Sequence, residues 1–112
     1  VTNTQLENIR STYPVWSRYV IEADTYPGQS TPVRSIAQPN FLSCRSDLPV
    51  DVVYQITETI YENLPYLQNI HSATNAMQLN KAIEGLAVPL HPGAIKYYRE
   101  QGLAIPDHLV AQ

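Results

Sequence analysis

This sequence of 112 residues has little cysteine, little glycine and no concentration of positive charge. The single cysteine, Cys44, excludes an intrachain disulfide and a paired-cysteine zinc site, and it fits a cytosolic protein as well as an exported one without disulfides. The four glycines form no phosphate-cradling loop and no dinucleotide fingerprint. The net charge of −3, with acids and bases interspersed, argues against nucleic acid as a partner, because no basic stripe is present to neutralise phosphates. No apolar run is long enough to cross a bilayer.

What is present indicates a globular protein of one domain or part of one. Hydrophobic residues make up 44% and charged residues 15% of the chain, which is typical of folded rather than disordered proteins. The chain starts at Val1 without an initiator Met or a leader, which predicts a processed chain or an excised fragment. Nine prolines divide it into short elements.

The first part of the chain predicts a helix followed by short strands. Thr4–Thr12 carries apolar residues at helical spacing and stops before Pro14. Residues 15–23 are rich in aromatic and β-branched side chains and predict a strand. Pro27 and Gly28 suit the two central positions of a type II turn. Further short extended segments are expected at residues 33–37 and 40–45.

The second part predicts helices. Asp47 is the expected N-cap of a helix that ends or kinks at Pro65 and then continues briefly to His71. The apolar stripe expected on this helix is Val52, Val53, Ile56, Ile60 and Leu64. Thr74 or Asn75 is expected to cap the next helix, whose buried face would be Leu79, Ala82, Ile83 and Leu86. A final helix would begin at Pro92 and stop at Gly102, and an irregular surface strap would follow from Leu103.

These elements predict an α/β fold that is mostly helical, with few short strands and three to four helices. Two or three short strands do not make a self-sufficient sheet, so their apolar faces need strands from the parent chain or from a second copy. We therefore expect a fragment that self-associates through its unpaired strands.

Few residues predict catalytic or metal chemistry. His71, His91 and His108 have no partner at a metal-ligand spacing, so no metal site, catalytic residue or cofactor is predicted. His91 precedes a helix start, where its ring is expected to cap backbone groups or to pack on Tyr97 or Tyr98. Cys44 lies in an apolar segment and is expected to be a buried structural thiol.

Aromatic side chains gather around the predicted strand and turn. Tyr13, Trp16, Tyr19 and Tyr26 are amphipathic residues that either line a ligand cleft or fill a half-buried sheet face. The sequence leaves both interpretations open.

Three segments in order carry a family resemblance: Tyr13-Pro14 with Val20–Gln29, Asp47–Thr57 with Tyr61-Glu62-Asn63, and Gly85–Ala94 with Tyr97–Glu100. Together they resemble the TAXI-type solute-binding receptors of TRAP transporters, which are two-lobed extracytoplasmic proteins. The resemblance runs from about Leu6 to Gly102 and covers only the last third of the family pattern. Glu22 and Ala23 depart from it, because the family usually carries Pro followed by a small residue there.

The resemblance implies a domain organisation. Residues 1–23 would form the end of the second lobe, residues 24–37 the crossing between lobes, and residues 38–112 the C-terminal part of the first lobe. Leu86–Glu100 would pack on the outside of the first lobe, away from the ligand cleft.

The resemblance also implies a function without catalysis. A periplasmic receptor of this type captures a small carboxylate-bearing solute, such as an amino acid or a dicarboxylate, and delivers it to integral-membrane permease subunits. Tyr26 is the expected ligand contact, with Arg45 as a possible carboxylate partner. Arg45 is expected more strongly to form a surface salt bridge with Asp47.

Two other functions remain open from the residues alone. One is an independent helical module that binds a protein partner through tyrosines. The other is a small hydrolase that uses Cys44 or a serine with His91.

Overall fold

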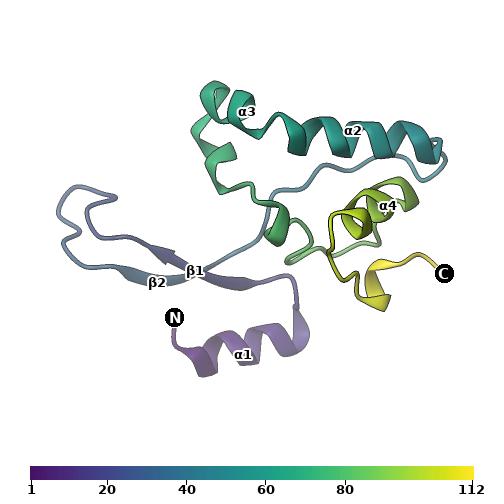
Figure 1. Ribbon diagram of the computed structural model, residues 1–112. Helices are drawn as coiled ribbons and strands as arrows, with labels where there is room; N and C mark the ends of the chain where they lie inside the picture. Colours follow the sequence, from purple (N-terminus) through teal and green to yellow (C-terminus); the bar gives the residue numbers. More distant parts are fainter. The chain divides into compact units, whose positions relative to one another are not determined.

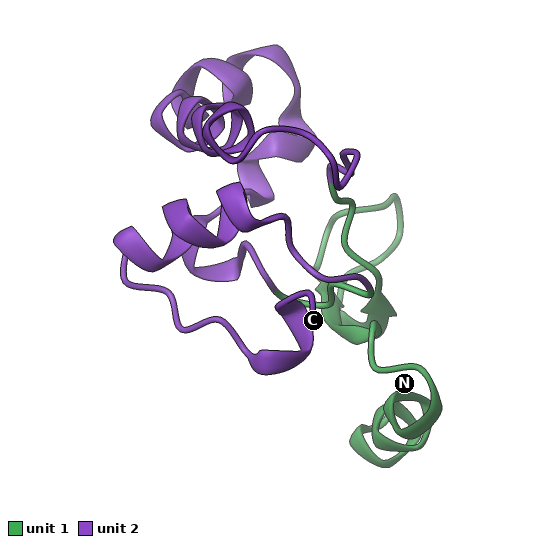
Figure 2. Cartoon of the chain, turned by 90° about the vertical axis from the view of Figure 1, so that its right-hand side faces the viewer, with its two compact units in different colours: residues 1–41, 84–87 green, residues 42–83, 88–112 purple.

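The structure, a computed structural model that describes residues 1–112, contains one β-hairpin, four α-helices and three short 3₁₀ turns (Figure 1). It divides into two compact units, coloured separately in Figure 2. Unit 1 comprises residues 1–41 and 84–87, and unit 2 comprises residues 42–83 and 88–112. The mixed, mostly helical architecture confirms the predicted fold class and is consistent with a fragment of a binding protein.

Unit 1 consists of helix α1 (Asn3–Thr12) and a hairpin of strands β1 (Ser17–Ile21) and β2 (Val33–Ala37). The strands are antiparallel, with a register that pairs Ser17 with Ala37 and Ile21 with Val33. The Arg18 guanidinium donates to the carbonyl oxygens of Val1 at 2.6 Å and Ser35 at 3.1 Å, which ties the start of α1 to the hairpin. The predicted helix and both strands are confirmed, although β1 is shorter than residues 15–23.

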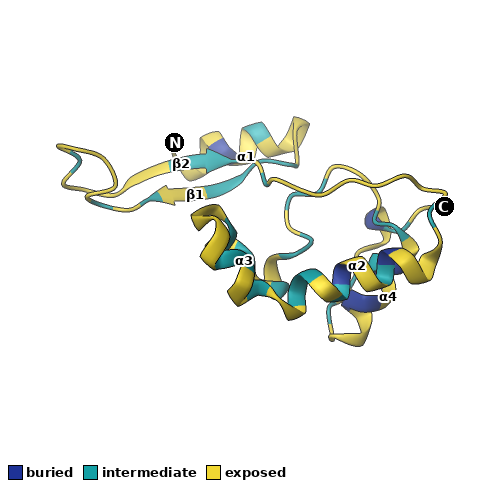
Figure 3. Ribbon diagram, turned by 90° about the horizontal axis from the view of Figure 1, so that it is seen from above, coloured by how far each residue is buried: buried dark blue, intermediate teal, exposed yellow.

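Unit 2 is built on helix α2 (Val50–Glu62) packed against helix α4 (Pro92–Glu100). The two backbones come close together at Gly93, where a Cβ atom would lie 2.7 Å from the Tyr54 nitrogen and closer still to the Val50 carbonyl oxygen. Only a residue without a side chain fits between the two backbones. In Figure 3 the buried residues of this unit cluster along α4 and the facing side of α2.

Tyrosine rings fill the rest of the contact between α2 and α4. The Tyr97 ring stacks on Tyr61 at a centroid distance of 6.0 Å and meets Tyr54 edge-on at 5.9 Å. Such offset and edge-on arrangements are the favoured geometries of aromatic pairs. Tyr97 and Tyr98 are only 4% and 8% exposed, so the tyrosines supply much of the small core of this unit.

The predicted start and apolar face of α2 are partly wrong. The N-cap is Pro49, which has no polar side chain to offer a hydrogen bond. Asp47 lies two residues before this cap and pairs with Arg45. Val53 is buried as predicted, but Val52 and Ile56 are exposed. Helix α4 packs on the side of α2 that carries Val53, Tyr54 and Thr57. The prediction from the apolar stripe did not include this packing partner.

The connection between α2 and α4 also differs from the prediction. The break near Pro65 is confirmed, because α2 ends at Glu62 and helix α3 (Leu64–Ile70) starts with Pro65 in its first turn. The helix expected after Thr74 is replaced by two 3₁₀ turns, η1 (Ser72–Ala76) and η2 (Leu79–Lys81). Extended backbone at Met77 and Gln78 separates these turns and prevents a continuous helix.

Two further expectations about irregular segments are corrected. Residues 40–45 pair with no strand and therefore form none. The C-terminal strap contains the 3₁₀ turn η3 (Asp107–Leu109), and Leu109, at 2% exposure, is buried rather than on the surface. Helix α4 begins at Pro92 and is followed by Gly102 at φ +86°, as predicted.

The close approach at Gly93 generates the first testable prediction. Gly→Ala changes within an open helix usually stabilise by about 0.5–1 kcal/mol. We expect Gly93→Ala to destabilise unit 2 by about 1–3 kcal/mol instead, because the new methyl group overlaps the α2 backbone. Urea unfolding followed by far-ultraviolet circular dichroism measures the change, and a stabilised variant would contradict the packing described here.

Candidate functional site

The loop between β1 and β2 presents Tyr26, the predicted ligand contact. Its tip is a type II turn, in which the Gln29 N–H donates to the Tyr26 carbonyl oxygen at 3.1 Å and Gly28 has φ +80°. The turn predicted from Pro27-Gly28 is therefore confirmed. The Asp24 N–H donates to the Gln29 carbonyl oxygen at 2.7 Å and closes the base of the loop. Tyr26 is 61% exposed, so its side chain is available to a ligand or partner.

Gln29 holds this loop from within, and sequence reasoning missed it. Its Nε2 lies within hydrogen-bond distance of three carbonyl oxygens, those of Ile21 at 3.3 Å, Glu22 at 2.9 Å and Thr31 at 3.0 Å. Its Oε1 is buried and accepts no hydrogen bond. A glutamine in a polar turn gives no sequence signal for such a role, because glutamine is equally common as a solvated side chain.

Arg45, the second predicted ligand contact, forms a salt bridge with Asp47. Its Nε donates to Oδ1 at 2.9 Å and its Nη2 to Oδ2 at 2.5 Å. The side chains are 80% and 63% exposed, so this is the surface pair that the sequence favoured over a ligand role. The pairing lowers the pKa of the Asp47 carboxyl and raises the pKa of Arg45. Arg45 belongs to unit 2 and Tyr26 to unit 1.

His91 is a structural residue at the start of α4. Its Nδ1 accepts a hydrogen bond from the Gly93 N–H at 3.1 Å, and this contact caps the helix. Since Nδ1 accepts, Nε2 carries the proton and donates to the Leu48 carbonyl oxygen at 3.0 Å. The expectation that the ring caps backbone groups is confirmed. Both ring nitrogens are used, so neither is left to act as a base on a nucleophile.

Tyr54 and Tyr98 of unit 2 are also structural. The Tyr54 hydroxyl donates to Glu100 Oε2 at 2.6 Å, and this hydrogen bond is the main reason that the pKa of Tyr54 is raised. Burial is the main cause of the raised pKa of Tyr98. These groups stay protonated near neutral pH and act as hydrogen-bond donors and packing surfaces.

The remaining chemistry-bearing residues are dispersed. Cys44 is exposed, which corrects the expectation of a buried thiol, because residues 40–45 form no strand that a core could cover. His71 accepts from the Ala73 N–H through Nδ1 and caps η1, and His108 is exposed. No group of three or more His, Cys, Asp or Glu side chains is placed to hold a metal ion.

Comparison with known families gives one finding that covers most of the chain. The family model of NMT1-like proteins matches residues 1–102. This chain belongs to the NMT1-like family. The family is one of extracytoplasmic solute-binding proteins, so membership implies a small-molecule ligand. No helix in the structure combines the length and the apolar character needed to span a bilayer.

The second prediction concerns the structural role of His91. His91→Ala removes the helix cap and the Leu48 contact, and we expect it to destabilise unit 2 by about 1–3 kcal/mol in urea unfolding. His91→Asn retains a capping side chain and should recover part of the loss. His108→Ala, at an exposed position, is the matched control and should change stability by less than about 0.5 kcal/mol. Equal stability of His91→Ala and His108→Ala would refute the structural role of His91.

The third prediction concerns the pH dependence of the Arg45–Asp47 pair. The folded-state pKa of Asp47 is lowered. The contribution of the pair to folding stability is therefore fully present above the ordinary carboxyl pKa and is lost as pH falls through the lowered pKa. We expect Arg45→Gln to raise the pKa of Asp47 toward its ordinary value in a carbon-detected NMR titration. An Asp47 titration curve that is identical in both proteins would show that the pair does not persist in solution.

Proposed function

We propose that this chain is the C-terminal part of a TAXI-type receptor of a TRAP transporter. In this role it captures a small carboxylate-bearing solute, such as an amino acid or a dicarboxylate, in the periplasm and acts without catalysis. The closed receptor then delivers the solute to integral-membrane permease subunits. The observation that carries the proposal is the match of a solute-binding family over residues 1–102.

The three ordered segments that resemble TAXI receptors support the finer assignment. They fall within the matched residues, and the Val20–Gln29 segment contains the turn that carries Tyr26. In this proposal residues 1–23 end the second lobe, residues 24–37 contain the crossing and residues 38–112 complete the first lobe.

Tyr26 is the proposed solute contact. It is exposed on a turn whose backbone is fixed by Gln29 and Asp24, so little conformational entropy is lost when the ring meets a ligand. Arg45 would contact a carboxylate only by giving up Asp47, which makes it the weaker candidate. Two hydrogen bonds to Asp47 already engage its Nε and Nη2 groups.

An independent helical interaction module is the second candidate. The exposed pair Tyr66 and Ile70, 67% and 63% exposed and four residues apart on α3, favours it because such a pair can dock on a partner. The isolated chain would then remain a monomer. A receptor fragment is instead expected to self-associate through the free edges of its two-stranded sheet.

The fourth prediction tests the transport role on the gene product that carries this sequence. Calorimetric titration with glutamate and succinate should show saturable binding, whereas succinamide and glucose should not bind. Tyr26→Ala should weaken carboxylate binding by about tenfold or more. Tyr66→Ala, a similarly exposed tyrosine on α3, is the matched control and should leave affinity unchanged.

Cellular uptake tests the delivery step. Deletion of the gene should abolish uptake of the labelled solute that the purified protein binds, and the wild-type gene should restore it. Binding of glucose in place of carboxylates would contradict the proposed solute class. Uptake that is unaffected by the deletion would contradict the proposed role as a transport receptor.

A further inference from the structure

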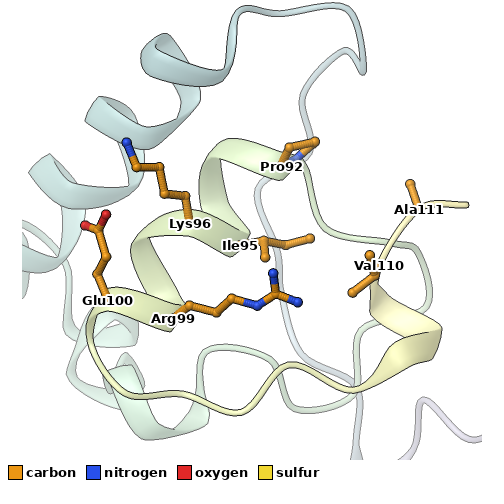
Figure 4. Close-up of a pocket in the computed structure, with 7 residues that line it drawn as sticks. All are labelled: Pro92, Ile95, Lys96, Arg99, Glu100, Val110 and Ala111. Atoms are coloured by element: carbon orange, nitrogen blue, oxygen red, sulfur yellow. The ribbon is translucent and has the colours of Figure 1, made fainter.

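A shallow cavity of about 420 Å³ lies between α4 and the C-terminal strap, within unit 2 (Figure 4). Its volume falls in the range of small-molecule pockets, about 300–1,000 Å³. The apolar part of its lining comes from Pro92 and Ile95 on α4 and from Val110 and Ala111 on the strap. The transport proposal assigns no role to this cavity.

The strap that forms one wall is fixed to the rest of the unit. The Leu90 N–H donates to the Leu109 carbonyl oxygen at 2.8 Å, and Leu90 forms a parallel bridge with Val110. Leu109, 2% exposed, anchors the strap in the core. The two walls therefore hold their positions without a ligand.

One unpaired cation faces the apolar lining. In Figure 4 the Arg99 side chain extends across the cavity toward Val110, and no hydrogen bond or ion pair engages its guanidinium. The neighbouring Glu100 accepts from the Tyr54 hydroxyl at 2.6 Å, and the Lys96 Nζ lies 4.9 Å from the centre of the Tyr54 ring. In the same view Lys96 and Glu100 point away from the Val110 side, so Arg99 is the charge nearest the apolar wall.

We propose that this cavity binds a small aliphatic monocarboxylate. The carboxylate accepts two parallel hydrogen bonds from N–H groups of Arg99. The planar guanidinium provides this paired geometry and an ammonium group does not. The aliphatic tail lies on Ile95 and Val110. This site is independent of the solute site around Tyr26, and either proposal can fail without the other.

The fifth prediction uses hexanoate as the probe and NMR of the uniformly labelled full chain as the readout. Hexanoate should cause saturable shifts of the backbone amides of Ile95, Arg99 and Val110. Hexanamide, which lacks the charge, and hexylammonium, which reverses it, should bind at least about tenfold more weakly. Shifts of equal size from hexanoate and hexylammonium would overturn the proposal.

Variants at the charge and at the rim separate this site from general hydrophobic binding. Arg99→Gln should weaken hexanoate about tenfold, and Arg99→Lys should restore part of the affinity. Arg10→Gln removes the same charge from α1 and should have no effect. Ala111→Asp should weaken binding and Ala111→Lys should strengthen it, because position 111 lines the cavity. Unchanged hexanoate affinity in Arg99→Gln, or shifts that never saturate, would refute the site.

Discussion

The contact between the α2 and α4 backbones at Gly93 is the constraint on which unit 2 depends. Because no side chain separates the helices at this point, Val53, Tyr54 and the α4 tyrosines come close enough to form a core. The His91 ring caps the start of α4 and also binds the Leu48 carbonyl group, which joins the two segments near this contact. A short segment of sequence thus determines both the beginning of a helix and the partner on which it packs.

Within the family-matched residues, the segment Leu86–Glu100 has structural roles in the helix contact. Its histidine caps a helix, its proline starts the helix and its glycine admits a neighbouring backbone. Family membership indicates a solute-binding protein, whereas the exposed side chain proposed to meet the solute lies on a different element, the turn at Tyr26. Helix α4 belongs to unit 2, whereas the Tyr26 turn belongs to unit 1.

Local rules in the sequence predicted the elements that depend on local chemistry. The Pro27-Gly28 turn, the Pro92 helix start and the Gly102 stop each follow from the backbone preferences of one or two residues. Features that depend on distant partners were missed. The buried side of α2 is set by α4, some forty residues later.

The candidate site residues show the same difference between features set by local sequence and features set by distant partners. The turn beside Tyr26 and the salt bridge of Arg45 follow from the Pro27-Gly28 pair and from two neighbouring opposite charges. Other features of the candidate sites depend on how separate segments fold back on each other. These are the three contacts of Gln29, the exposure of Cys44 and the position of Arg99 against the strap. A glycine in the first turn of a helix, as at Gly93, is the one sequence signal that could have indicated the tight helix contact, because glycine weakens a helix that has no such need.

The central claim is that the turn around Tyr26 meets a solute. Amide hydrogen exchange of the gene product, measured with and without a saturating carboxylate solute, tests it most directly. The account predicts slower exchange at the Asp24 and Gln29 amides, which donate the hydrogen bonds that close this loop, when solute is bound. Unchanged exchange throughout residues 22–32 in a protein shown to be saturated would contradict it.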